Sequence, residues 1–231
     1  MTRGDATGRS GSVTFAAITG REEAIPLRVL AERAGQRVFS VTLAPGERLE
    51  QEADGHLVIV ALSGRLALEI ASERRVLSLG QCAAIDDEVA YALEGAGSAP
   101  NVALGVAHRC RGRRSPGPGV VDLIEVARGA SGRGVLWALE ESADLNVNLA
   151  RLEAGDEVGS HVNDDVDVLL LGLEGEGTIE SAAGRARLGP LQLVHVPRGA
   201  PRRLVADEPF SYLSLHRRRT GLSIRSARHR A

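Results

Sequence analysis

The sequence contains no lysine, and all 28 basic residues among its 231 residues are arginine. A Schiff-base lysine and a phosphate-loop lysine are therefore both excluded. No apolar run approaches the ~20 residues that a membrane-spanning helix requires. The first twelve residues also lack the apolar core of a secretory signal. We therefore expect no membrane partner.

Cysteine and aromatic residues are scarce as well. Cys82 and Cys110 are too few for a disulfide framework, which favours free thiols and a cytoplasmic location. Aromatic residues make up 3% of the chain, so leucine and valine must supply the core. The formal net charge is −2, and the arginine clusters at 109–114, 217–219 and 225–230 lack interleaved aromatic residues. We therefore predict no nucleic-acid partner.

What the sequence does contain is an internal repeat. Residues 38–48 resemble 147–157, and 57–69 resemble 168–180. The two copies are offset by about 110 residues, because Gly64 matches Gly175 at a separation of 111 and Gly46 matches Gly155 at 109. The repeat predicts a tail at 1–22, a first unit at 23–108, a linker at 109–119, a second unit at 120–219 and a tail at 220–231.

Short apolar runs alternate with glycine, proline and acidic turns throughout both copies, at intervals typical of β-sandwiches and barrels. Residues 24–35 and 135–143 are the only segments that also fit a helical pattern. We interpret both as strands, because they precede the two copies at equivalent positions. The pattern therefore predicts an all-β protein with strands nearly everywhere.

The second copy resembles the two sequence motifs of the cupin superfamily of jelly-roll barrels. The matching positions are Gly155, His161, Asn163, Asp167 and Gly175 in the first motif, and Pro197, Gly199 and Arg202 in the second. Two such copies look like a bicupin that covers about residues 25–219. The resemblance implies two tandem cupin-type jelly-roll barrels, of which the N-terminal one is degenerate.

Cupins that bind a metal use two histidines and a glutamate from the first motif and a histidine from the second. In this chain the corresponding positions hold His161, Asn163, either Asp167 or Val168, and Arg202. The resemblance thus implies at most a divalent transition metal (Fe, Mn, Ni or Zn) held by His161 and Asp167. Asparagine is a poor ligand for such ions, and an arginine cation beside the ion opposes binding.

A second interpretation is a pocket for a small polar ligand. If the strand is regular, His161, Asn163, Asp165 and Asp167 share one face, which Leu169 and Leu171 continue into the barrel. Arg202 and His195 are expected to lie beside them. Because buried carboxylates need a positive partner, we expect Arg202 to replace the charge of the metal and to pair with a carboxylate.

Three functions follow from these patterns. The first is binding of a small polar ligand in the C-terminal barrel by His161, Asn163, Asp165, Asp167, Arg202 and His195, with the N-terminal barrel as a scaffold or as the surface of a homodimer. The second is a metal-dependent enzyme of the dioxygenase or isomerase type. The third is a non-catalytic structural module. Fold alone does not decide between them.

Overall fold

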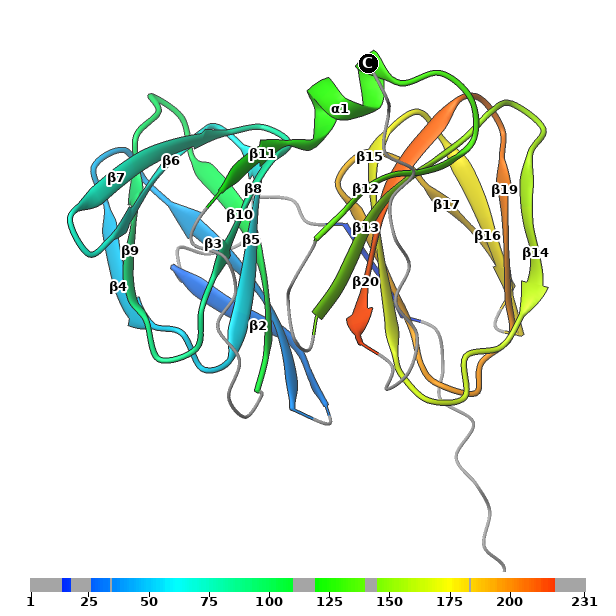
Figure 1. Cartoon of the computed structure of the whole chain (residues 1–231), viewed down its shortest axis with the longest axis horizontal. Coiled ribbons are helices and arrows are strands. Elements are labelled where there is room, and N and C mark those ends of the chain that lie inside the picture. Colours follow the sequence, from blue (N-terminus) through cyan, green and yellow to red (C-terminus); the bar gives the residue numbers. More distant parts are fainter. Residues whose placement is uncertain are drawn as a thin grey trace, which may run out of the picture.

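The computed structural model describes residues 14–17, 26–33, 35–109, 119–139, 145–182 and 184–218. Two β-barrels lie next to each other, and the helix α1 (Leu123–Gly129) lies on the chain between them (Figure 1). Each barrel combines a six-stranded and a four-stranded antiparallel sheet. The predicted all-β jelly-roll architecture is therefore confirmed.

The N-terminal barrel is the set of strands β2 to β11. Its six-stranded sheet has the order β11 (Val120–Asp122), β8 (Gln81–Ile85), β5 (His56–Ser63), β10 (Asn101–His108), β3 (Gln36–Leu43) and β2 (Leu27–Arg33). Its four-stranded sheet has the order β4 (Arg48–Glu52), β9 (Ala90–Gly95), β6 (Arg65–Ile70) and β7 (Glu73–Ser78).

The C-terminal barrel consists of β1 and β12 to β20. Its six-stranded sheet has the order β1 (Thr14–Ala17), β18 (Gln192–Val196), β15 (Val168–Glu174), β20 (Phe210–Arg217), β13 (Leu145–Leu152) and β12 (Gly134–Ala138). Its four-stranded sheet has the order β14 (Glu157–His161), β19 (Arg202–Ala206), β16 (Gly177–Ser181) and β17 (Gly184–Leu188). The strand orders of the two barrels correspond one to one.

Two short strands cross the boundaries that the repeat predicts. Residues 14–17 of the predicted N-terminal tail form β1, which pairs with β18 of the C-terminal barrel. Conversely, β11 was expected in the second unit but pairs with β8 of the N-terminal barrel. The repeat could not indicate this exchange, because a three- or four-residue strand carries too little pattern to specify which sheet edge it joins. The rest of the predicted tails and most of the linker, including Cys110, lie outside the described residues.

Within 24–35 and 135–143 the described residues form β2 over Leu27–Arg33 and β12 over Gly134–Ala138, so the interpretation as strands is confirmed for these residues. The helix α1 was not predicted. Its N-cap is Asp122, whose side chain accepts a hydrogen bond from the backbone N–H of Glu125 at 2.9 Å. Leu123 and Ala127 are fully buried on the face that packs against both barrels. No helix in the described part of the chain is long and apolar enough to cross a membrane.

The molecule has three apolar cores. One fills the N-terminal barrel, one fills the C-terminal barrel, and a third lies between the two six-stranded sheets. In β15, Val168 and Leu170 belong to the core inside the barrel, whereas Leu169 and Leu171 belong to the core between the barrels. Both faces of the six-stranded sheets are therefore buried, and the two barrels share a continuous apolar interface.

The matched glycines of the repeat make the tight turns that the fold requires. Gly64 follows β5 and Gly175 follows β15, each with a φ of +69°. A Cβ atom on Gly175 would lie 2.0 Å from the carbonyl oxygen of Pro209. Glycine is therefore required at this turn both by conformation and by space.

Candidate functional site

The polar stretch after β14 forms a loop and not a continuous strand. The strand β14 ends at His161 and β15 begins at Val168. Asn163 is 2% exposed, and its Oδ1 accepts hydrogen bonds from the backbone N–H groups of Asp165 at 3.3 Å and Val166 at 3.4 Å. Asn163 thus stabilises the loop through its side chain. The expectation that four polar side chains share one strand face is wrong, because this turn breaks the alternation.

Asp167 lies on the opposite side of the sheet from the barrel interior. Its Oδ2 is 3.2 Å from Nε2 of His195, and its Oδ1 accepts a 2.8 Å hydrogen bond from the backbone N–H of Arg198. His195 is the cross-strand partner of Leu169, whose side chain belongs to the core between the barrels. The expected inward direction of Leu169 and Leu171 is therefore also wrong, and the Asp167–His195 pair belongs to the inter-barrel side.

His161 and Asp165 are both exposed. The Nδ1 atom of His161 is 2.8 Å from the carbonyl oxygen of Gly159, so this nitrogen carries the proton and Nε2 is the remaining acceptor. His161 pairs across the strands with Arg202. Of the six residues predicted from the sequence, the structure thus brings together His161 with Arg202, and Asp167 with His195.

Arg202 extends from β19 into the C-terminal barrel. The alternating residues Leu204 and Ala206 belong to the interior core, so Arg202 is on the interior face at the end of the strand. Burial raises the pKa of the Tyr212 hydroxyl, and the positive charge of nearby Arg202 opposes this shift. An arginine and a tyrosine therefore lie close together inside this barrel.

Further interior polar residues were not identified from the sequence. Asn146 and Asn148 on β13 face inward, because the alternate residues of this strand belong to the core between the barrels. Their cross-strand partners on β20 are His216 and Ser214. One signal in the sequence could have indicated that Asn148 faces inward. The repeat aligns Asn148 with Phe39, which belongs to the interior core of the N-terminal barrel.

Hydrogen bonds fix one of these pairs. His216 Nδ1 lies 2.7 Å from the carbonyl oxygen of Arg217, so this nitrogen carries the proton. His216 Nε2 then accepts from Asn146 Nδ2 at 3.0 Å. By contrast, Asn148 is only 7% exposed, and its Oδ1 has no hydrogen-bond partner in the described structure. A buried acceptor without a partner costs about 1–3 kcal/mol, so a donor from a bound molecule would stabilise it.

The residues at the cupin metal positions do not fit a metal ion. The Oδ1 atom of Asn163 is engaged by two backbone N–H groups, Val168 occupies the inward position next to Asp167, and Arg202 brings a positive charge. Among the described residues, no three histidine, cysteine, aspartate or glutamate side chains are grouped to hold an ion. The metal site suggested for His161 and Asp167 is not assembled, because these side chains belong to a rim and to the inter-barrel face.

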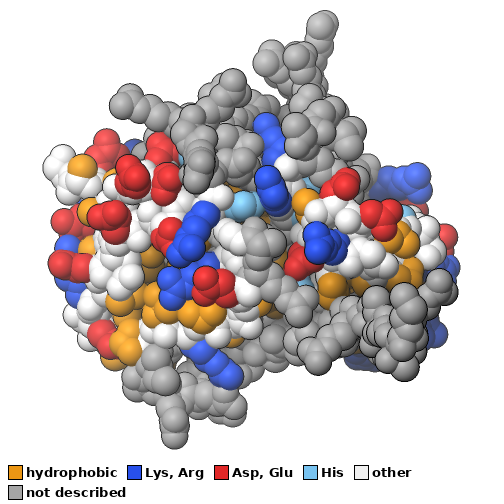
Figure 2. Space-filling model, turned by 90° about the horizontal axis from the view of Figure 1, so that it is seen from below, with side chains coloured by type: hydrophobic (Ala, Val, Ile, Leu, Met, Phe, Trp, Pro, Cys, Tyr) orange, Lys and Arg blue, Asp and Glu red, His pale blue; other side chains and the backbone are white. Residues whose placement is uncertain are grey.

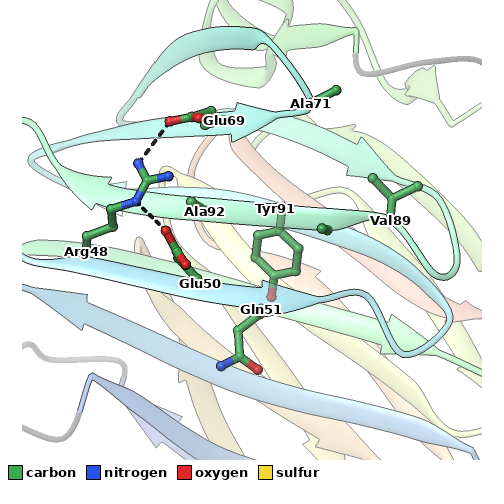
Figure 3. Close-up of a pocket in the computed structure, with 9 residues that line it drawn as sticks. Arg48, Glu50, Gln51, Glu69, Ala71, Val89, Tyr91 and Ala92 are labelled. Atoms are coloured by element: carbon green, nitrogen blue, oxygen red, sulfur yellow. Dashed lines mark hydrogen bonds and ion pairs between the residues drawn. The ribbon is translucent and has the colours of Figure 1, made fainter.

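A groove of about 370 Å³ lies on the outer face of the four-stranded sheet of the N-terminal barrel (Figure 3). Arg48 crosses this groove and donates hydrogen bonds to Glu50 and Glu69, each at 2.9 Å. The floor contains Ala90 and Ala92. Since the charged groups of the groove already pair with one another, it offers a ligand little uncompensated polarity.

Both barrels have an end on the lower side of the molecule (Figure 1). Figure 2 shows this side, where acidic side chains gather over the N-terminal barrel, and arginine and histidine side chains lie nearer the middle.

No family model and no curated protein matches the sequence. Solved structures do match the fold. Protein Ylba from E. coli, a DUF861 protein, has a TM-score of 0.72 at 14% identity, with 93% of this chain and 94% of that chain covered. A cupin 2 conserved barrel domain protein from Leptotrichia buccalis has a TM-score of 0.67 at 16% identity, covering 94% and 92%.

A third structure, salicylate 1,2-dioxygenase from Pseudaminobacter salicylatoxidans, has a TM-score of 0.66 at 14% identity, covering 82% of this chain and 75% of that chain. At these identities the likeness concerns the fold. It extends over most of the chain and not over one barrel alone.

Proposed function

Because this chain has the cupin fold in two tandem barrels, we propose that it binds a small polar anion inside the C-terminal barrel. The observation that carries the proposal is Asn148, a buried side chain whose Oδ1 has no partner in the described structure. A hydroxyl or amino group of a ligand would supply the missing donor.

The charge of the interior supports an anion. Arg202 contributes a guanidinium group, and on the described strands β13, β19 and β20 the interior face carries no carboxylate. The planar arginine fork pairs well with a carboxylate. Tyr212, which stays neutral because burial raises its pKa, and Ser214 add hydroxyl groups. We therefore assign the ligand to the class of small hydroxylated or amino-substituted carboxylates.

Of the alternative functions, the metal-dependent enzyme is less well supported. Its ligand positions hold an engaged asparagine, a valine and an arginine. A purely structural module does not account for a row of polar side chains in the interior of one barrel only. The proposed function therefore remains binding, without an assigned reaction.

The test compares two neighbouring arginines of β19. Calorimetric titration of the full chain with glycerate, a three-carbon hydroxy acid, should show binding that survives treatment with EDTA. The change Arg202→Leu should weaken it at least about tenfold, because it removes a charge-assisted hydrogen bond. The matched change Arg203→Leu should leave it unchanged, since Arg203 pairs with Glu157 and Glu180 on the outer face.

Asn148→Leu provides the second arm. It replaces the unpartnered acceptor with an apolar side chain, and glycerate binding should fall while the fold is retained. The proposal would be contradicted if the wild-type chain bound neither glycerate nor related hydroxy acids. It would also be contradicted if this binding depended on a metal that EDTA removes.

A further inference from the structure

Two connections lie next to each other at one end of the C-terminal barrel. Residues 162–167 lead from β14 in the four-stranded sheet to β15 in the six-stranded sheet, and residues 197–201 lead from β18 in the six-stranded sheet back to β19. The last residue of β14 pairs with the first residue of β19, and the first residue of β15 pairs with the last residue of β18. Both connections therefore join the two sheets at the same corner, and the second one ends directly before Arg202.

Hydrogen bonds fasten the first connection to the second. The backbone N–H of Gly199 donates to the carbonyl oxygen of Asn163 at 2.7 Å. The backbone N–H of Arg198 donates to Oδ1 of Asp167 at 2.8 Å, and Oδ2 of Asp167 lies 3.2 Å from Nε2 of His195. The Asp167 and His195 side chains are only 17% and 16% exposed, so water competes little for these contacts. Asp167 thus holds the turn from β18 to β19 at two points.

The N-terminal barrel fastens the corresponding corner in the opposite sense. The backbone N–H of Glu88 donates to the carbonyl oxygen of Ala53 at 2.9 Å, as in the other barrel. The carboxylate, however, belongs to Asp87 in the connection from β8 to β9, and its Oδ1 accepts a 2.7 Å hydrogen bond from the backbone N–H of Gly55 in the connection from β4 to β5. A carboxylate therefore joins the two connections in each barrel, but the two carboxylates stand on opposite connections.

The turn that Asp167 holds is short and stiff. The backbone N–H of Ala200 donates to the carbonyl oxygen of Pro197 at 3.1 Å, which closes the turn. Pro201, whose ring fixes its φ, directly precedes Arg202. A change in the position of the turn is therefore transmitted to Arg202, because the segment between them has little freedom to absorb it.

We propose that Asp167 is a positioning residue for Arg202. Asp167 lies on the inter-barrel side of its sheet and touches no ligand in the barrel. It fixes the turn from β18 to β19, and the turn fixes the start of β19, where Arg202 enters the interior. This inference rests on the proposed binding of a small anion by Arg202, and it makes a contact between the barrels a determinant of binding inside one of them.

The negative charge of Asp167 gives the proposal a distinct sign. A carboxylate near the binding site repels an anion, so an effect through charge alone predicts that its removal strengthens anion binding. An effect through position predicts the opposite, because the turn and Arg202 lose their fixed place when Asp167 is removed. The direction of the change in affinity therefore distinguishes the two roles.

The experiment titrates full-chain variants with glycerate by calorimetry. Asp167→Ala should lower the affinity at least about tenfold, although it removes a negative charge. Asp167→Asn should keep the affinity within about threefold of the wild-type value, because its Oδ1 can still accept from the backbone N–H of Arg198. Unchanged or tighter binding in Asp167→Ala would overturn the proposal. If Asp167→Ala does not fold, as judged by circular dichroism, His195→Leu replaces it, and the affinity should fall by a smaller factor.

Asp87→Ala is the matched control, because it removes the corresponding fastening from the N-terminal barrel. It should lower the thermal stability to a similar extent as Asp167→Ala and leave the affinity for glycerate unchanged. An equal loss of affinity in Asp87→Ala would show that general destabilisation causes both losses, and it would overturn the positioning role.

A measurement without ligand separates this inference from the proposed function. Amide hydrogen exchange, followed by NMR, should become at least about tenfold faster at Arg198, Gly199 and Arg202 in Asp167→Ala and should stay unchanged there in Asp87→Ala. Unchanged exchange at Arg202 in Asp167→Ala would overturn the positioning role, whether or not glycerate binds. If exchange responds as expected but the wild-type chain binds no glycerate, the positioning of Arg202 is supported and only the proposed function fails.

Discussion

The two barrels share one strand order but differ in what fills them. In the N-terminal barrel, Phe39 lies opposite Gly105, where an added Cβ would come within 2.2 Å of the phenyl ring. At the equivalent cross-strand pair the C-terminal barrel holds Asn148 and Ser214. One aromatic ring over a glycine is thus replaced by two polar side chains. The repeat preserves the barrel fold. At this pair of positions, however, the interior is apolar in the N-terminal barrel and polar in the C-terminal barrel.

The barrels are alike in a way that residue-by-residue comparison of the repeats does not reveal. Each has an interior arginine near an interior tyrosine. In the N-terminal barrel they come from β3 and β9, as Arg37 and Tyr91, and in the C-terminal barrel from β19 and β20, as Arg202 and Tyr212. Tyr91 and Arg202 occupy equivalent strand positions. Both barrels therefore contain an arginine and a tyrosine in the interior, but these two residues come from different strands in the two barrels.

The largest expected effect concerns Phe39. Truncation of this buried ring in Phe39→Ala should lower the free energy of unfolding by about 3–5 kcal/mol, because it leaves a cavity in the N-terminal core. The equivalent change Asn148→Ala should cost no more than about 1 kcal/mol, since it removes an acceptor that has no partner in the described structure. Urea unfolding of both variants measures the contrast, and equal losses would show that the two interiors do not differ as described.

The tyrosines provide a pH test of the same burial. The chain has two tyrosines, Tyr91 and Tyr212, and burial raises the pKa of both, that of Tyr91 to about 12. Since the unfolded value is about 10, the neutral hydroxyl contributes stability below pH ~10 that is lost as the pH rises toward the folded values. Absorbance at 295 nm should show little tyrosinate at pH 10 in the folded protein. Ionisation of one tyrosine near pH 10 would contradict the burial of one of the two hydroxyls.

A smaller effect is expected at Gly105. Gly105→Ala places a methyl group against the Phe39 ring and should cost about 1–3 kcal/mol through overpacking. The same change in a Phe39→Leu background should cost less, because the smaller side chain leaves room. Ser214→Ala is the matched control in the other barrel. Thermal unfolding of the four variants tests the pair, and additivity of Gly105→Ala and Phe39→Leu would argue against a direct clash.

The smallest effect is expected on the outer faces. In the C-terminal barrel, Arg203 on the central strand β19 pairs with Glu157 and Glu180. In the N-terminal barrel, Ala92 on β9 occupies the equivalent position, and the cation is instead Arg48 on the edge strand β4. These arginine side chains are 39% and 35% exposed, so Arg203→Leu and Arg48→Leu should each cost less than about 1 kcal/mol, and less still in high salt. A salt-independent loss in Arg203→Leu alone would show that the central position matters.

Much of the fold could be predicted from the sequence, whereas the site could be predicted only in part. Turn glycines such as Gly64 and Gly175 and the apolar runs between them indicated two barrels. The structure places Arg202 on the interior face of β19, opposite His161 on β14. Asp167 was misplaced, because the turn built on Asn163 changes the phase between β14 and β15. Asn148 was missed because the local pattern of β13 does not show its direction, and only its alignment with Phe39 in the first copy could have indicated it.

The sequence by itself determined the all-β class, the tandem repeat and the positions of most strands, since these depend on local periodicity and on turn residues. Only the tertiary structure decided which face of β15 looks into the barrel. Both faces are apolar there, because one fills the barrel and the other packs against the second barrel, so the alternation that normally distinguishes inside from outside is absent. The exchange of β1 and β11 also emerged only when the sheets were assembled, because strands of three or four residues carry too little pattern to specify a sheet edge. The polar lining of the C-terminal barrel emerged only then because the local pattern does not say which face of β13 looks inward.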